Sequence, residues 1–322
     1  MNPASEARYK QRTTTVNVIE LELNATSPFR LDLTAWVLRR RAKNEMDVWD
    51  GDAACYRRSI ALPESGPVAL AVSQNGSHDD PGIQVRISGE FSEESARREV
   101  AAALTKVLGL DQDLSGFTRM AAADPDLGPI AERMRGVKPP RFPTVFEALV
   151  NGVACQQLSL EVGLHVLNRL TRRYGQPVPG EESVGQAFPG PEDLAGIEPE
   201  EVKSLGFSFN KARTIIDASR AIVTSDLDLE GTERLDDETA YGRLTSLRGV
   251  GRWTAEYVML RGLGRTHIFP GDDVGAHNKL RRLLNLGPDL HYETVQELVA
   301  RWQPWAGLVY FHLLLDSLDL ET

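Results

Sequence analysis

The sequence is poor in the residue types that build metal and disulfide sites. Its 322 residues include two cysteines, Cys55 and Cys155, and six histidines. Two cysteines cannot supply a four-cysteine zinc or iron–sulfur centre, and the histidines form no cluster with the spacing of metal ligands. We therefore expect two reduced thiols, no metal and no cofactor.

Long apolar runs are also missing. No stretch approaches the roughly 18 apolar residues that a membrane-spanning helix requires. The first eight residues contain no apolar segment of the kind that a secretion signal needs. We expect a cytoplasmic protein with no membrane partner, which begins with a short mobile tail.

Basic residues are outnumbered by acidic ones. The chain has 36 Lys and Arg against 46 Asp and Glu, which gives a formal net charge of −10 at pH 7. Because phosphate contacts dominate affinity for nucleic acids, this charge argues against indiscriminate coating of such polymers. Residues 243–282 differ, since they contain eight basic and three acidic side chains. This stretch indicates a local basic surface, with ordinary solvated helix faces as the alternative.

The patterning changes along the chain from strands to helices. Alternating apolar residues predict strands over 15–23, 68–72 and 83–87, and Asn75-Gly76 predicts a turn between the last two. Helices are predicted from residue 31 and over 93–104. We therefore predict an α+β fold in which a β-rich N-terminal domain, residues 1–112, precedes an all-helical core, residues 113–322.

The helical part carries clear start signals. Thr144 and Glu147 have the spacing of a capping box, Ser159 begins another helix, and the stretch 226–231 is predicted to be an acidic surface loop. Further helices are predicted over 191–195, 198–204 and 208–223. No internal repeat of 20–50 residues is visible.

A pair of glycines marks the segment that is most informative about function. Gly249 and Gly251, on either side of Val250, predict a tight hairpin between a helix ending near Ser246 and another starting near Arg252. The free N–H groups at a helix N-terminus can bind a phosphate oxygen, and the glycines leave room for a close approach. A hairpin that only connects two helices is the alternative.

An aspartate follows this hairpin in the sequence, at a spacing that is informative about function. Asp273 lies 22 positions after Gly251, at the predicted start of another helix. This order resembles the helix-hairpin-helix/Gly-Pro-Asp superfamily of DNA glycosylases, and within it the 3-methyladenine DNA glycosylase II (AlkA-type) family. The resemblance covers most of the chain: residues 27–30 and 49–51 resemble the family's N-terminal domain, 142–159 its first core helices, and 301–305 the start of its C-terminal helix.

The resemblance implies a monofunctional DNA glycosylase that excises alkylated bases, such as 3-methyladenine or 7-methylguanine, in base excision repair. Its expected partner is double-stranded DNA with damaged bases, and we expect a monomer. Asp273 is the implied catalytic carboxylate, with Asp272 as the alternative; a simple helix cap is the competing role for either. A fixed anion would stabilise the positive charge that develops on deoxyribose and could orient the attacking water.

Further site residues follow from the same resemblance. Trp253 stands where bifunctional members have a lysine, and an indole cannot form a Schiff base. Trp253 and Tyr257 are the implied base-pocket residues, with core packing of this helix face as the alternative. Gln157 matches the residue that fills the gap left by the flipped base, with an ordinary turn residue between two helices as the alternative. The implied contacts to the DNA backbone come from Gly249, Val250, Gly251, Arg252, Thr254 and Lys279.

Two positions depart from the family pattern. Arg248 stands where the hairpin often has proline, and Leu314 where the family has another pocket tryptophan. Two other functions stay open at this point. One is a glycosylase for oxidised bases, against which Trp253 counts. The other is a non-enzymatic helix-hairpin-helix DNA-binding protein, against which Asp273 counts.

Overall fold

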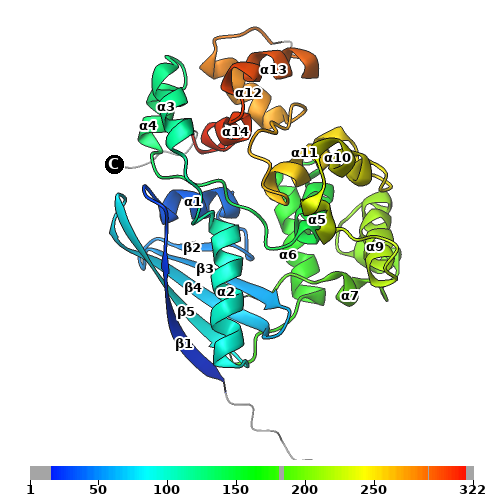
Figure 1. Ribbon diagram of the computed structural model, residues 1–322. Helices are drawn as coiled ribbons and strands as arrows, with labels where there is room; N and C mark the ends of the chain where they lie inside the picture. The colour runs from blue at the N-terminus through cyan, green and yellow to red at the C-terminus, as the bar shows by residue number, and fades with distance from the viewer. Residues whose placement is uncertain (1–15, 181–184, 289, 317–322) are drawn as a thin grey trace, which may run out of the picture.

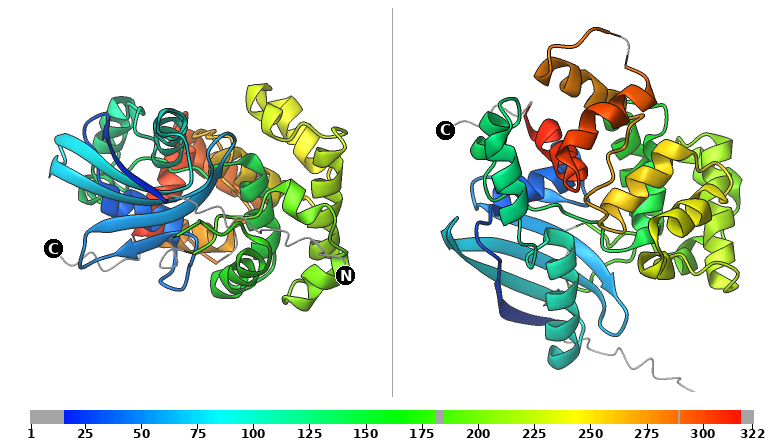
Figure 2. Two further views of the ribbon diagram at one scale, coloured as in Figure 1. Left: turned by 90° about the horizontal axis from the view of Figure 1, so that it is seen from below. Right: turned by 45° about the horizontal axis from the view of Figure 1, so that its top comes forward.

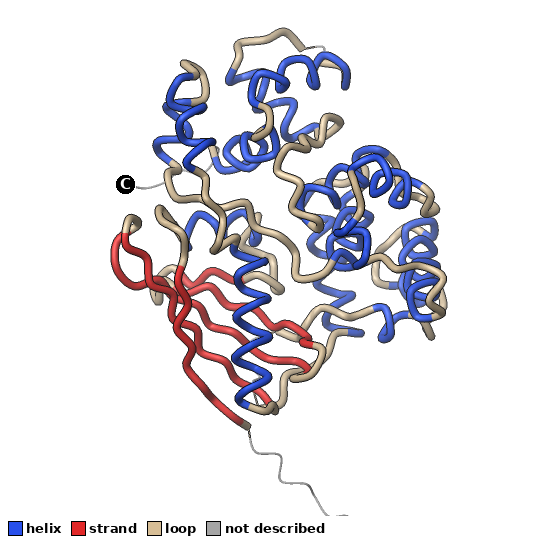
Figure 3. The backbone as a smooth tube through the Cα atoms, in the orientation of Figure 1, coloured by secondary structure: helices blue, strands red, loops and turns tan. Residues whose placement is uncertain are grey.

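A computed structural model describes residues 16–180, 185–288 and 290–316; the tail predicted at residues 1–8 lies outside these ranges. The strands gather on one side of the molecule and helices fill the rest (Figure 3). This segregation confirms the predicted α+β class, with the β-rich part first in the chain.

The N-terminal part is a five-stranded antiparallel sheet of order β1-β5-β4-β3-β2. Its strands are β1 (Asn17–Asn24), β2 (Val48–Asp50), β3 (Cys55–Leu62), β4 (Gly66–Ser77) and β5 (Asp80–Gly89). The predicted turn at Asn75-Gly76 is wrong, because both residues lie in β4 and pair with Gly82 and Pro81. The ladder continues to the Ser77–Asp80 pair, which moves the reversal to the residues between them.

Two helices cover this sheet. They are α1 (Leu31–Arg39) and α2 (Glu93–Leu108). Figure 1 shows α2 lying along the sheet and α1 between the sheet and α14 (Ala306–Leu315). Leu31 and Leu38 of α1 pack in the sheet core, whereas Leu33 and Val37 pack with α14. The α1 helix therefore joins the N-terminal part to the helical part.

The remaining helices form two further hydrophobic cores. The first contains α5 (Val145–Cys155), α6 (Leu160–Tyr174), α7 (Pro191–Leu194), α8 (Pro199–Ser204), α9 (Phe209–Val223), η1 (Glu230–Arg234), α10 (Asp237–Thr245) and α11 (Arg252–Arg261). The second contains α3 (Ser115–Ala123), α4 (Gly128–Arg133), α12 (Val274–Leu283), α13 (Tyr292–Val299), η2 (Ala300–Trp302) and α14. In both views of Figure 2, α7–α10 lie on the side of the molecule away from the strands. Helix α11 belongs to both cores, since Tyr257 packs in the first and Leu260 in the second.

The predicted helix starts at Thr144 and Ser159 are confirmed. Thr144 caps α5 by accepting the Glu147 N–H at 3.0 Å, and Ser159 caps α6. The capping box is only half formed, because the Glu147 carboxylate is buried against Arg58 instead. Glu230 caps the same helix end differently, by accepting the N–H groups of Val145 and Phe146 at 3.0 Å. The stretch 226–231 is therefore not a simple surface loop.

The described residues contain neither a membrane-spanning helix nor a cluster of metal ligands. No helix within residues 16–180, 185–288 and 290–316 is both long and apolar enough to cross a membrane. In the same part of the chain, no three His, Cys, Asp or Glu side chains are arranged to hold a metal ion.

Candidate catalytic site

Gly249 and Gly251 occupy the hairpin for different structural reasons. Gly249 has φ +77°, and a Cβ there would lie 2.3 Å from Thr214 Oγ1, so the fold itself requires glycine. Gly251 has φ −96° and open space where a Cβ would point. Val250 turns inward and is 6% exposed. The hairpin therefore presents backbone to the outside, followed by the first amides of α11, which have no acceptor within the helix.

Gln156 ties this hairpin to the turn after α5. Its Nε2 donates to the Gly249 carbonyl at 2.9 Å and to Thr254 Oγ1 at 2.8 Å. Thr254 is 1% exposed, so its side chain holds the hairpin from within. Lys211 fixes the same turn by donating to the carbonyls of Ala154 and Gln156. Sequence reasoning missed Gln156 and Lys211, because their partners are distant in the chain.

Gln157 lies at the tip of this anchored turn. It is exposed and has φ +53°, a conformation that few residues other than glycine adopt. Leu158 beside it is 43% exposed, although it is apolar. The residue predicted to fill a gap in DNA is therefore exposed in a fixed turn, next to the residue that contacts the hairpin.

Asp273 is held by donors from three helices. It is the N-cap of α12, where its Oδ1 accepts the Ala276 N–H at 2.8 Å. Its Oδ2 accepts the Trp253 indole N–H from α11 at 3.2 Å and the Tyr310 hydroxyl from α14 at 3.1 Å. The carboxylate is therefore fixed where the two helical cores meet, beside the positive end of a helix.

Tyr310 is a site residue that the sequence did not reveal. It is 3% exposed and packs edge-on against Phe269. Burial, and then the charge of Asp273, raise the pKa of Tyr310 well above its ordinary value. The hydroxyl therefore stays protonated and can only donate to the carboxylate. The family pattern directs attention to Leu314, one turn later on α14, and offers no signal at position 310.

Asp272 makes a different set of contacts. Its carboxylate pairs with Arg252, with Nε to Oδ2 at 2.8 Å, and the Arg252 guanidinium lies 3.6 Å from the centre of the Tyr292 ring. The Tyr292 hydroxyl donates to Glu256 at 2.5 Å, and Glu256 also accepts the Gly271 N–H. These contacts anchor the turn before α12, so the geometry favours Asp273 over Asp272 as the reactive carboxylate.

Trp253 and Tyr257 are brought together as predicted. Their rings stack with centroids 5.4 Å apart and planes 28° apart. Tyr257 is only 3% exposed, whereas Trp253 keeps part of its surface accessible. The Tyr257 hydroxyl accepts an N–H from Arg40 at 3.1 Å. The stack therefore joins Asp273, which Trp253 contacts, to a cation from the N-terminal part.

The predicted basic surface is smaller than its charge count suggests. Arg261 is 1% exposed and donates to the Val37 carbonyl, and Arg265 pairs with Asp237. Lys279 donates to the Leu314 carbonyl at 2.8 Å, and burial lowers the pKa of Lys279 to about 8. Arg248 is about half exposed and lies beside the hairpin. Internal packing therefore engages several of the cations that the sequence suggested for phosphate binding.

Proteins with similar sequences and folds are named as DNA repair enzymes. The family profile described as "HhH-GPD superfamily base excision DNA repair protein" matches residues 150–304. The chain is 28% identical over 221 residues to the DNA-3-methyladenine glycosylase of Bacillus subtilis, covering 69% of this chain and 73% of that protein. It is 29% identical over 310 residues to a probable bifunctional transcriptional activator/DNA repair enzyme AlkA of Mycobacterium tuberculosis, covering 95% of this chain but 59% of that protein. A 3-methyladenine DNA-glycosylase structure from Archaeoglobus fulgidus superposes with a TM-score of 0.80 at 26% identity, covering 91% of this chain and 97% of that one.

Proposed function

Because this chain belongs to the HhH-GPD superfamily of base excision DNA repair proteins and is of the AlkA type, we propose that it is a monofunctional DNA glycosylase that excises alkylated bases. The observation that carries this proposal is the Asp273 carboxylate, fixed at the start of α12 and bonded to a tryptophan where a bifunctional enzyme needs a lysine. The relatives are named as 3-methyladenine glycosylases, and these names favour the proposal of alkylated substrates over that of oxidised ones.

Asp273 would act on the sugar. Breaking the bond between C1′ and the base leaves positive charge on the deoxyribose, and a fixed anion nearby lowers that barrier electrostatically. Water then attacks C1′ and loses a proton to solvent or to the carboxylate. The three donors on Asp273 hold its charge in place, so little reorganisation is needed during the reaction.

The hairpin would bind the DNA backbone. We assign the phosphate contact to the amides of the Gly249–Gly251 turn and the first turn of α11, which an extrahelical nucleotide could then approach. The exposed ion pair between Arg252 and Asp272 is weak enough for a phosphate to compete for the guanidinium. Gln157 would fill the gap in the duplex, and Lys279 and Thr254 would support this surface from within.

The proposed substrates are bases made cationic by alkylation. A cationic base is attracted to an electron-rich ring such as that of Trp253, a contact worth on the order of 0.5–2 kcal/mol. Such bases are also good leaving groups, which suits a site built around one carboxylate.

The function is tested by incubating the protein with a duplex that contains one 7-methylguanine and then heating in alkali. We expect strand breaks at the lesion above those of a no-enzyme control, because alkali cleaves the abasic sites that base removal leaves. A matched duplex with 8-oxoguanine should be cleaved more slowly. Faster removal of 8-oxoguanine would contradict the alkylation proposal, and removal of neither base would contradict the glycosylase proposal.

The protein should leave abasic sites without nicking them. Trp253 has no amine that could attack C1′, so no covalent intermediate with the sugar is expected. The measurement is borohydride treatment during turnover, followed by denaturing electrophoresis, with a bifunctional glycosylase as the positive control. A trapped protein–DNA adduct would show that some other amine takes the lysine's place.

Replacing Tyr310 with phenylalanine should slow single-turnover excision by about tenfold, because one hydrogen bond to the reactive carboxylate is lost. The melting temperature should change little, since the ring and its packing remain. Tyr56→Phe is the matched control: it also removes a buried hydroxyl donor, but from Asp47 in the N-terminal part. Equal slowing by both variants would mean that Tyr310 acts only through stability.

A further inference from the structure

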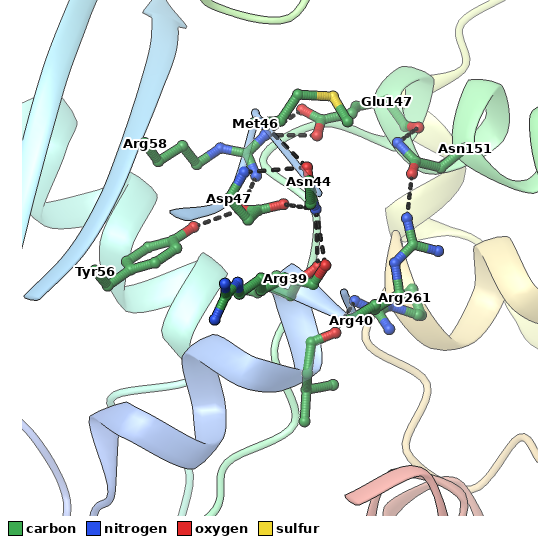
Figure 4. Close-up of polar contacts among 12 residues, drawn as sticks. Arg39, Arg40, Asn44, Met46, Asp47, Tyr56, Arg58, Glu147, Asn151 and Arg261 are labelled. Carbon is green, nitrogen blue, oxygen red and sulfur yellow. Dashed lines mark hydrogen bonds and ion pairs between the residues drawn. The ribbon is translucent and has the colours of Figure 1, made fainter. Parts of the chain in front are cut away.

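A buried polar cluster joins the sheet to α5. Arg58 of β3 is 1% exposed and pairs with Asp47 at 2.5 Å and with Glu147 of α5 at 2.5 Å. Figure 4 shows that both carboxylates turn toward Arg58. Arg58 thus binds both acids of this cluster, and the Tyr56 hydroxyl also donates to Asp47.

Arg40 extends from the same region toward the candidate site. It follows α1, and its guanidinium donates from Nη2 to Asn151 Oδ1 of α5 at 2.7 Å (Figure 4) and from Nη1 to Tyr257 Oη at 3.1 Å. The Cys155 sulfur lies 4.0 Å from Nη1. These partners are neutral, so no direct ion pair neutralises Arg40 within the described contacts.

The geometry of Arg40 is costly for the fold. Its backbone has φ +59°, which is unfavourable for a residue with a side chain. Its Nε is buried and has no hydrogen-bond partner in the part of the chain that the structure describes. The residue as a whole is nevertheless only partly buried. Strained, incompletely paired residues of this kind cluster at functional sites.

The two ends of the stack formed by Trp253 and Tyr257 lie beside charges of opposite sign. At the Trp253 end lies the Asp273 carboxylate. At the Tyr257 end lie Arg40 and the buried Arg261, whose guanidinium is 5.8 Å from the Tyr257 ring centre. The acids nearest to these cations, Asp47 and Glu147, are engaged by Arg58. A base bound on the accessible part of Trp253 would therefore have the Asp273 anion on its sugar side and, beyond Tyr257, a cation on its far side.

We propose that Arg40 is a specificity-determining residue that stabilises the electron pair left on the departing base. This inference rests on the proposed glycosylase function. When the C1′–N bond breaks, both electrons go to the base nitrogen and water oxygen later bonds to C1′. A neutral base then leaves as an anion and takes a proton from water, whereas a cationic base leaves neutral. Asp273 stabilises the positive charge on the sugar in both cases. Arg40 lowers the barrier, relative to free DNA, mainly for the neutral lesions.

The Arg40 charge should therefore change the ratio of two rates. We would measure single-turnover excision of 1,N6-ethenoadenine, a neutral adduct, and of 7-methylguanine, a cationic one, from matched duplexes at enzyme concentrations below the dissociation constant, so that each rate refers to free enzyme and free DNA. In Arg40→Gln, excision of ethenoadenine should fall by on the order of 10²-fold, as for the loss of one preorganised group that faces developing charge. Excision of 7-methylguanine should fall by no more than about threefold under these conditions, because Arg40 repels the bound cationic base about as much as it favours the loss of that charge, and the two effects offset each other. Arg40→Lys, which keeps the charge, should restore most of the ethenoadenine rate.

Asn151→Ala is the structural control, because it breaks the same link to α5 and keeps the Arg40 charge. It should leave the ratio of the two rates close to that of the wild type. Equal losses for both lesions in Arg40→Gln, or the same ratio in Asn151→Ala as in Arg40→Gln, would overturn the proposal and leave Arg40 a structural bridge. If the wild type removes 7-methylguanine and ethenoadenine removal does not depend on Arg40, only this inference fails. If it removes neither base, the proposed function fails.

Discussion

Asp273→Asn should lower the rate of base excision by on the order of 10³-fold, since it removes the negative charge that we propose stabilises the sugar. The fold should persist, because asparagine caps a helix about as well as aspartate and can still accept the Ala276 N–H. Binding of a duplex with an abasic-site analogue should change little. The measurements are single-turnover excision of 7-methylguanine and the dissociation constant of the analogue.

Asp272→Asn is the matched control for this experiment. It changes the adjacent carboxylate in the same way, but that group pairs with Arg252 at the surface and does not contact Trp253 or Tyr310. We expect its excision rate to stay within a few fold of the wild type, as for loss of an exposed ion pair worth roughly 0–1 kcal/mol. An active Asp273→Asn with an inactive Asp272→Asn would move the catalytic role one residue back.

Gly251→Asp should weaken binding to all DNA sequences alike, by about tenfold or more, which corresponds to about 1.4 kcal/mol. The fold can accept the change: φ is −96°, the space for a Cβ is open, and position 251 is the N-cap of α11, where aspartate is favourable. The new carboxylate would occupy the place that we assign to a phosphate. Binding is measured by fluorescence anisotropy at several salt concentrations, with melting temperature recorded in parallel.

Two variants separate the causes of this loss. Asparagine has nearly the same shape as aspartate and also caps a helix. Gly251→Asn therefore tests whether an uncharged side chain obstructs the phosphate, and it should weaken binding less than Gly251→Asp. Gly249→Ala should instead destabilise the protein by about 1–3 kcal/mol, because φ is +77° and Thr214 Oγ1 lies 2.3 Å from the new Cβ. Unchanged affinity in Gly251→Asp would mean that the hairpin only connects two helices.

Local sequence determined much of this protein. The alternation of β1, the helix starts at Thr144 and Ser159, and the α+β order all follow from patterns within a few residues. Residues 249–251 were enough to predict the hairpin, and Asp273 to predict the start of α12. Such features are predictable because backbone conformation, capping and periodic burial depend on near neighbours.

Tertiary structure decided which side chains complete the site. Tyr310 reaches Asp273 across 37 positions, and Arg40 reaches Tyr257 across 217. Packing also decided that Arg252 pairs with Asp272, that Arg261 is buried, and that Glu147 pairs with Arg58 and leaves its capping box half formed. No local pattern carries this information, because which distant groups meet, and which charges are matched before a ligand arrives, depends on how the three cores pack together.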